Sequence, residues 1–352
     1  MIPHSRLTIS QEESQAVARV VASGAIAQGA AVREFEAAVA SYVGVKGGVA
    51  VSSGTSALHV ALIAMGVSVG DEVVLPSYLC VAPVNAIHYV GATPVLADVN
   101  PATGNISPES ARRVITPKTK AIIVPHMMGM PAEIEALRSL GVPLLEDCAQ
   151  SIGACYKGGQ TGSFGTAAIC SFYATKVFAC GEGGMVLSND TGILDAVRDL
   201  RDYDEKTPYK VRYNYKMTDI QAALGISQLK RLPEFIAARR KIASLYDAEL
   251  AGCGIDLPVK DIDCEPISFR YVLRLKQKVD NFINNMQGLN IVCRRAIYKP
   301  LHVLLGQPTL QQTETLYNES VSIPIYPTLT IQEQEQVITA VKKIALNPSC
   351  RA

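Results

Sequence analysis

The sequence contains no tryptophan, and aromatic residues make up only 6% of its 352 residues. Neither charge is in excess, because 33 Lys and Arg stand against 32 Asp and Glu without a long block of either sign. This balance argues against a nucleic-acid-binding protein and against docking on an anionic membrane. Apolar runs long enough to span a bilayer are missing, and the opening MIPHSRLTISQEES has no apolar leader core. We therefore expect a cytoplasmic protein whose partners are small molecules and copies of itself.

The cysteines lack a metal-binding or disulfide pattern. The sequence has no CxxC pair and no histidine at zinc-ligand spacing. We therefore expect no metal site, and we interpret most cysteines as small buried hydrophobic residues in a reducing compartment. The nine cysteines are Cys80, Cys148, Cys155, Cys170, Cys180, Cys253, Cys264, Cys293 and Cys350.

Hydrophobic residues account for 48% of the chain, which is enough for the cores of about two domains. From about residue 47 to residue 190, short runs rich in Val, Ile and Leu alternate with amphipathic stretches. That alternation indicates βαβ units, and continuous apolar runs are typical of a parallel sheet covered by helices on both faces. The expected fold class is therefore α/β, with a mainly parallel central sheet.

The pattern changes after Asn214. A long helical pattern, MTDIQAALGISQLKRLPEFIAARRKIASLYDAEL, is interrupted by Pro233 and leads out of the sheet region. An alternating strand (ISFRYVLRL), a helix around VDNFINNMQGL, a short strand (NIVCR) and an amphipathic helix from Thr330 follow. We predict a large domain over residues 1–250 and a smaller α+β domain over residues 251–352.

Three segments of the sheet region carry candidate site residues. In SSGTSALHVAL a strand ends, Gly54 permits a tight turn, and Thr55 and Ser56 stand where the next helix begins. Free N–H groups and the positive end of the helix dipole attract an anion, so this turn is a candidate phosphate site. The same hydroxyl residues are equally ordinary helix N-caps.

The second segment, VPLLEDCAQSIGA, places Asp147 at the carboxyl end of a buried strand, where open α/β sheets bind their ligands. A carboxylate there requires a cation or several donors, and a protonated pyridine nitrogen is one such cation. Gln150 has an amide that can donate to a cofactor's phenolic oxygen. Taken alone, Asp147 also fits a turn cap, and Gln150 also fits a surface position.

The third segment, GSFGTAAICSFYATKVFACGEGGMVLSND, contains a predicted strand that leads to Ser171 and then to Lys176. Lys176 stands among apolar residues, which favours a partly desolvated, nucleophilic amine. The glycines that follow let the backbone pass close to a ligand. An isolated lysine is usually a solvated surface group, so this interpretation depends on the two other segments.

Together these segments resemble the DegT/DnrJ/EryC1/StrS family of sugar aminotransferases, which are fold-type I enzymes dependent on pyridoxal 5'-phosphate (PLP). The resemblance covers nearly the whole chain and also includes GDEVVLPSY, GEGGMV, YNYKMTDIQAALG and IPIYPTLT. It implies that Lys176 forms a Schiff base with PLP, that Asp147 pairs with the pyridine nitrogen and that Gln150 reaches the phenolic oxygen. It also implies a homodimer with shared active sites. In each site the phosphate is bound beside Gly54 by Thr55, Ser56 and Ser171 of one subunit and by Asn214 of the neighbouring subunit.

Two positions depart from the family pattern. Cys80, in PSYLCVAPVNAI, stands where many members place an aromatic ring over the cofactor, so the group that stacks on the ring is open. Met128, in PHMMG, likewise replaces an aromatic residue near the substrate pocket. We still expect Cys80 to contact the cofactor.

The remaining polar candidates lie near the presumed pocket. YKPLH resembles a family block close to the substrate, which makes Tyr298 and His302 candidate substrate-binding residues. His126 either faces the ligand or is a structural histidine with satisfied hydrogen bonds, the commoner case. A diphosphate or carboxylate could be bound by basic residues of the same region, unless these are simply solvated: Arg294, Arg295 and Lys299.

The resemblance implies a ping-pong transamination from an amino acid, commonly L-glutamate, to a nucleotide-linked keto-sugar. Lys176, once released, would move a proton between the substrate and the cofactor. A cyclitol ketone as acceptor and a PLP-binding regulatory protein without turnover are the alternatives. Dehydratase relatives carry histidine in place of Lys176, and the GxGxxG turn of a dinucleotide-binding oxidoreductase is missing.

Overall fold

The computed structural model describes residues 1–276 and 278–346, so Cys350 lies outside the described residues. Its centre is a seven-stranded sheet with the order β1-β9-β8-β5-β4-β2-β3. Neighbouring strands from β8 to β3 are parallel, and β9 is antiparallel to both of its neighbours, as the predicted α/β class requires. The strands are β1 (Gly47–Val51), β2 (Glu72–Pro76), β3 (Thr93–Ala97), β4 (Thr119–Pro125), β5 (Leu144–Asp147), β8 (Ala167–Ser171) and β9 (Gly184–Ser188).

Helices cover both faces of this sheet, which explains why its strands are apolar without alternation. In β1, Val49 and Val51 join one hydrophobic core while Ala50 between them joins the core on the opposite face. On the first face lie α3 (Gly54–Ala64), α4 (Ala82–Tyr89) and α7 (Thr191–Leu200). On the other lie α2 (Ala30–Val43), α5 (Pro108–Val114), α6 (Ile134–Arg138) and the first part of α8 (Asp219–Leu250).

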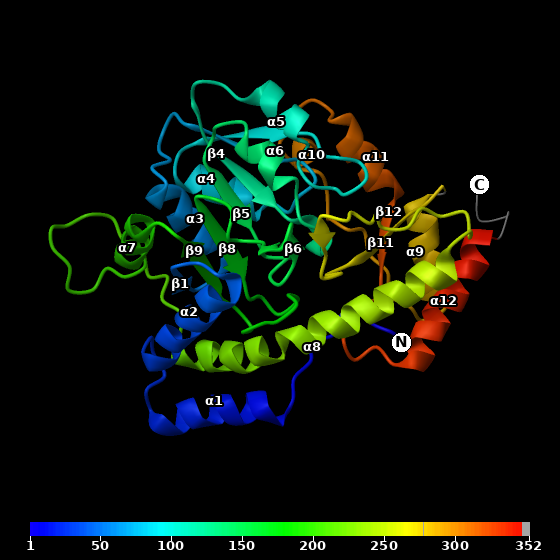
Figure 1. Cartoon of the computed structure of the whole chain (residues 1–352), viewed down its shortest axis with the longest axis horizontal. Helices are drawn as coiled ribbons and strands as arrows, with labels where there is room; N and C mark the ends of the chain where they lie inside the picture. Colours follow the sequence, from blue (N-terminus) through cyan, green and yellow to red (C-terminus); the bar gives the residue numbers. More distant parts are fainter. Residues whose placement is uncertain (277, 347–352) are drawn as a thin grey trace.

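Helix α8 (Asp219–Leu250) runs unbroken past Pro233, so the predicted interruption is wrong. Proline removes one helix hydrogen bond, but buried side chains on either side, Leu229, Leu232, Phe235 and Ile236, hold the helix against the core. Figure 1 shows α8 passing beneath both parts of the molecule, from α1 (Gln11–Ser23) to α12 (Ile331–Leu346). It therefore connects the sheet region to the C-terminal part.

The C-terminal part has a core of its own around the antiparallel pair β11 (Tyr271–Arg274) and β12 (Ser320–Ile323). The predicted strand NIVCR is reduced to isolated bridges, with Ile291 opposite Ile2 and Arg294 opposite Ser322. Other elements are α9 (Val279–Gly288), α10 (Leu301–Leu304), α11 (Gln311–Glu319) and the small sheet of β6 (Cys155–Tyr156), β7 (Gly159–Gln160) and β10 (Cys264–Glu265). The division at residue 250 stays a prediction. Over the described ranges, no helix combines the length and apolar character needed to cross a bilayer.

Candidate active site

Asp147, Lys176 and Cys80 meet at the carboxyl ends of the parallel strands. Asp147 ends β5, Lys176 follows β8, and Cys80 follows β2. Burial lowers the pKa of the Lys176 amine, and the nearby Asp147 carboxylate partly opposes that shift. Burial also raises the pKa of Asp147 and of the Cys80 thiol, and the nearby Lys176 charge partly opposes both shifts. The structure thus assembles the predicted lysine and aspartate at one point.

The Lys176 amine has no carboxylate in ion-pair contact among the described residues. Its Nζ lies 5.8 Å from the centroid of the Phe269 ring. The backbone of the same residue is fixed by a hydrogen bond from its N–H to the Tyr173 carbonyl, at 2.9 Å. A half-buried amine with a lowered pKa and no fixed partner is suited to react with a carbonyl group.

Asp147 is only 7% exposed, yet its carboxylate is poorly satisfied. One oxygen accepts a hydrogen bond from the Ala149 N–H at 3.0 Å, and within the described ranges the other oxygen has none. A buried carboxylate in this state costs free energy unless a cation meets it. The residue therefore fits a protonated pyridine nitrogen as its partner.

Gln150 follows Asp147 by three residues, and its side-chain NH₂ group donates no hydrogen bond among the described residues. Its side-chain oxygen accepts a hydrogen bond from the Met128 N–H at 3.1 Å. That contact fixes which way the amide points, since the oxygen must face Met128. The NH₂ group remains available to a ligand oxygen, as the sequence predicted for the phenolic oxygen of PLP.

The turn before α3 leads into the N-terminus of that helix, and Ser53 is the N-cap residue. The Ser53 hydroxyl accepts a hydrogen bond from the Ser56 N–H at 3.0 Å, and the Ser56 hydroxyl lies 2.9 Å from that of Ser53 and 3.1 Å from that of Ser52. Ser56 is thus engaged in the cap. The N–H groups of Gly54 and Thr55 belong to the first helical turn, where no preceding carbonyl is available to them.

Gly54 brings this turn against the end of β8. A Cβ atom at Gly54 would lie 2.8 Å from the Cβ of Ser171, closer than real contacts allow. Gly184 similarly has no room for a side chain, since its Cβ would lie 2.2 Å from the Ser53 carbonyl oxygen. The predicted phosphate residues at positions 54–56 and 171 therefore adjoin one another, and the fit to an anion at a helix N-terminus is good.

The three other predicted residues are placed differently. Asn214 is exposed near the end of the loop of residues 201–218, which projects from the body beside α7 (Figure 1). The carbonyl of the next residue, Tyr215, accepts a hydrogen bond from the Ser52 N–H at 2.8 Å, beside the predicted phosphate turn. Tyr298 is 80% exposed. His302 is buried, and its ring nitrogens lie 2.7 Å from the Ser77 hydroxyl and 2.9 Å from a Glu314 oxygen. Because both nitrogens are in use, this position favours a structural role for His302 over the predicted contact with substrate.

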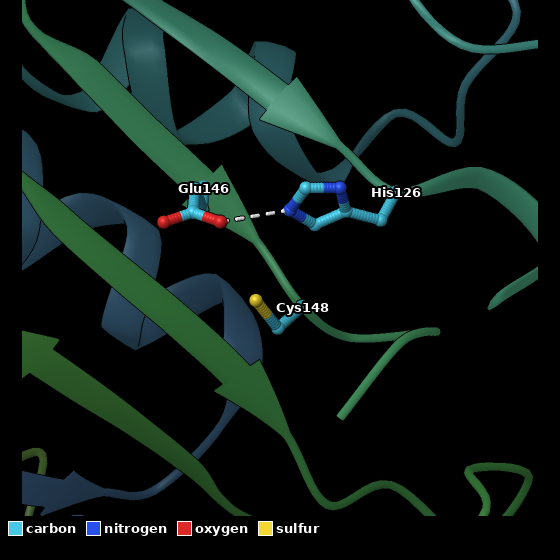
Figure 2. A group of neighbouring side chains, drawn as sticks. All are labelled: His126, Glu146 and Cys148. Atoms are coloured by element: carbon cyan, nitrogen blue, oxygen red, sulfur yellow. Dashed lines mark hydrogen bonds and ion pairs between the residues drawn. The ribbon is translucent and has the colours of Figure 1, made fainter. Parts of the chain in front are cut away.

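His126, Glu146 and Cys148 form a buried group beside the site, shown in Figure 2. His126 Nδ1 accepts a hydrogen bond from the Ala132 N–H, so Nε2 carries the proton and donates to Glu146 at 3.0 Å. Burial raises the pKa of the Cys148 thiol well above its usual value. Although the spacing would suit a metal, the ligand atoms are occupied by protons and hydrogen bonds. His126 is thus a structural histidine.

Sequence reasoning overlooked Phe269 and Arg270. Both follow a left-handed residue, Ser268, in the segment that enters β11. The Phe269 ring lies near Lys176, and the Arg270 charge helps to lower the pKa of that lysine. The available signal was an arginine inside an otherwise apolar strand pattern.

Comparisons with known proteins agree with this geometry. The model of the DegT/DnrJ/EryC1/StrS aminotransferase family matches residues 7–342. The GDP-perosamine synthase of Caulobacter vibrioides is 36% identical over 331 residues, covering 88% of this chain and 89% of that protein. The structure of S. venezuelae DesV in complex with a ketimine intermediate has a TM-score of 0.91 at 32% identity, covering 96% of this chain and 95% of that one. Spr1654 of Streptococcus pneumoniae, known in apo, PLP and PMP forms, has a TM-score of 0.92 at 26% identity in the PMP form, covering 98% and 97%. The chain belongs to the DegT/DnrJ/EryC1/StrS aminotransferase family.

Proposed function

We propose that this aminotransferase uses PLP to transfer an amino group from L-glutamate to a nucleotide-linked keto-sugar. The observation that carries the proposal is the pairing of an uncommitted lysine amine with a buried, poorly satisfied carboxylate at the carboxyl edge of the sheet. Lys176 has the lowered pKa of a nucleophilic amine, and Asp147 needs a cation. These are complementary requirements, and one pyridoxal ring meets both.

The residues around this pair have defined tasks in the proposal. PLP, when bound, supplies an electron sink for the bond broken at the amino-acid α-carbon. Asp147 keeps the pyridine nitrogen protonated, and the Gln150 amide donates to the phenolic oxygen. The first turn of α3 and Ser171 bind the phosphate. The Lys176 amine, once released from the cofactor, would take the proton from the α-carbon and deliver it to the C4′ carbon of the cofactor, and its lowered pKa favours the neutral form that can accept this proton.

For the acceptor we propose a GDP-linked keto-sugar. Support comes from two relatives named GDP-perosamine synthase, from C. vibrioides and from Vibrio cholerae; the second is 32% identical over 362 residues. A cyclitol ketone is the alternative acceptor. A regulatory protein without turnover is disfavoured, since the chain retains Lys176, Asp147 and Gln150.

We also propose that the enzyme is a homodimer with shared active sites. The loop of residues 201–218 projects from the body, and its Tyr209 is 92% exposed. Exposed aromatic residues on a projecting loop are favourable in an interface. Asn214, at the base of the loop, would reach the phosphate site of the other copy.

The first test is the absorbance of the purified protein with PLP, before and after L-glutamate, for the wild type and Lys176→Ala. We expect a visible cofactor band in the wild type that glutamate converts to the shorter-wavelength PMP band. The variant should lack the visible band. Absence of the band in the wild type would refute the PLP proposal.

A second experiment addresses the acceptor. Protein converted to the PMP form is mixed with GDP-linked keto-sugars, with other nucleotide-linked keto-sugars and with a cyclitol ketone, and return of the visible band is followed. We expect the fastest return with a GDP-linked ketone. Return only with the cyclitol would overturn the sugar assignment while leaving the transaminase intact.

A further inference from the structure

A cavity of about 150 Å³ lies beside the candidate active site, between the sheet region and the C-terminal part. From the sheet region it is bordered by Tyr78 and Met128, and from the C-terminal part by Leu257, Arg270 and Ser320. Lys176 and Asp147 do not line it. Most of its walls are apolar, so a charged group on them requires an explanation.

Four charged side chains border the cavity: Asp247, Lys260, Arg270 and Arg274. Asp247 pairs with Lys260 at 2.9 Å, and Arg274 pairs with Glu319 at 2.7 Å. Arg270 is the one of the four whose charge has no ion-pair partner among the residues described. Burial lowers the pKa of Arg270, and the exposed Arg294 adds to this effect by repulsion. Arg270 therefore remains a partly desolvated cation that an anion would stabilise.

Arg270 is also within reach of the reacting amine. The Phe269 ring centroid lies 5.8 Å from Lys176 Nζ and 5.7 Å from Arg270 Cζ, so the two cations cannot be farther apart than the sum of these distances. The span of glutamate from its amine to its side-chain carboxylate, with one hydrogen bond added, is about 9 Å. The upper limit, 11.5 Å, is of the same order as this span, so an amino acid with its carboxylate on Arg270 can bring its amine close to the position of the Lys176 amine.

The backbone holds Arg270 in register with the cofactor residues. Its N–H donates to the Met128 carbonyl at 3.4 Å, and the Met128 N–H in turn donates to Gln150. One residue along, a Cβ at Gly129 would lie 2.9 Å from the Phe269 nitrogen, so only glycine permits this approach. The distance between Arg270 and the cofactor is therefore set by packed backbone and not by a mobile loop.

We propose that Arg270 binds a carboxylate of the amino donor while the donor's amine occupies the position of the Lys176 amine. This inference rests on the proposed function. One guanidinium matches one carboxylate through two parallel hydrogen bonds, whereas a diphosphate carries more charge than one guanidinium neutralises. The nucleotide-linked diphosphate is the other possible source of the anion, and the two half-reactions separate the two sources.

The test compares Arg270→Met, which keeps the length of the side chain and removes the charge, with the wild type in single-turnover half-reactions. The rate constant for glutamate with the PLP form should fall by about 100-fold, as expected for two lost charge-assisted hydrogen bonds. The rate constant for the keto-sugar with the PMP form should change by less than about threefold. Arg138→Met is the matched control, since its side chain is exposed on α6 and does not line the cavity, and both rates should be retained.

Binding of glutarate to the PLP-free protein, measured by calorimetry, provides a readout without turnover. We expect it to weaken by about tenfold or more in Arg270→Met and to be unchanged in Arg138→Met. If Arg270→Met does not fold, Arg270→Gln replaces it. Loss confined to the keto-sugar half-reaction would assign Arg270 to the diphosphate and overturn the proposal, as would equal loss in both half-reactions or in neither. A wild type that glutamate leaves unchanged would instead refute the proposed function.

Discussion

Replacing Glu146 with glutamine should strongly destabilise the fold, although the substitution alters only one atom. The Glu146 carboxylate is fully buried and accepts hydrogen bonds on both oxygens from His126 and from three backbone N–H groups: Gly162, Phe164 and Gly165. Burial alone would raise its pKa, but the hydrogen bond and charge of His126 and the backbone donors lower it below the usual value. The group is therefore ionised at neutral pH.

A glutamine in this position cannot satisfy these donors, whichever way its amide is turned. If the NH₂ group replaces Oε1, it meets the N–H groups of Phe164 and Gly165. If it replaces Oε2, it meets the Gly162 N–H and His126 Nε2, which cannot give up its proton because Nδ1 already accepts one. Two buried donors are left unpaired in either case, at about 1–3 kcal/mol each, so we expect a loss of about 4 kcal/mol.

Thermal unfolding followed by far-ultraviolet circular dichroism measures this loss, since the chain has no tryptophan to report by fluorescence. For a chain of 352 residues, a loss of about 4 kcal/mol corresponds to a fall in the midpoint of about 5 °C. The control is Glu135→Gln, because Glu135 is 60% exposed where it pairs with Lys157, and such pairs contribute less than about 1 kcal/mol. A midpoint for Glu146→Gln as close to the wild type as that of the control would refute this account of the network.

Two further predictions concern the site and the N-terminal arm. Asp147→Asn should still take up PLP on Lys176 but should react with glutamate about 10²–10³ times more slowly in stopped-flow absorbance, because a neutral amide does not hold the pyridine nitrogen protonated; a rate within threefold of the wild type would contradict the assignment. Burial, aided by Arg270, lowers the pKa of His4 from 6.5 to about 3, and its ring lies 2.9 Å from the Ser322 hydroxyl. The unfolded chain then binds a proton that the folded chain does not, so stability falls as the pH drops below about 6.5, by about 2 kcal/mol at pH 5. Urea unfolding at pH 7 and pH 5 should show that His4→Gln removes this part of the loss, and an unchanged acid sensitivity would argue against it.

The sequence predicted the parts of the fold that depend on local periodicity. Apolar runs such as VPLLED are strands because both faces of the sheet are covered, and this pattern is visible along the chain. Long-range packing explains the failures: α8 continues through Pro233 because its neighbours are buried in the core, and NIVCR finds only single bridging partners at Ile2 and Ser322. No local pattern contains that information.

The candidate site divides in the same way. Motifs identified Lys176, Asp147 and Gln150, whose chemistry is carried by short segments at strand ends. The use of both His302 nitrogens within the chain depends on Ser77 and Glu314, from distant segments, and was invisible in YKPLH. The same is true of Arg270, because its significance lies in the carboxylate that it lacks.

Two adjacent carboxylates at the end of β5 have different roles, since Glu146 stabilises the fold and Asp147 is available to a ligand. Successive side chains of a strand point to opposite faces, so Glu146 and Asp147 enter different surroundings. Glu146 finds four donors within the chain, and nothing about it calls for a ligand. Asp147 finds one backbone donor, and the cations nearest to the site, Lys176 and Arg270, likewise lack ion-pair partners among the described residues. Charged groups that have no ion-pair partner within the chain are stabilised when a ligand supplies one, so a ligand that meets these three groups should also stabilise the folded protein.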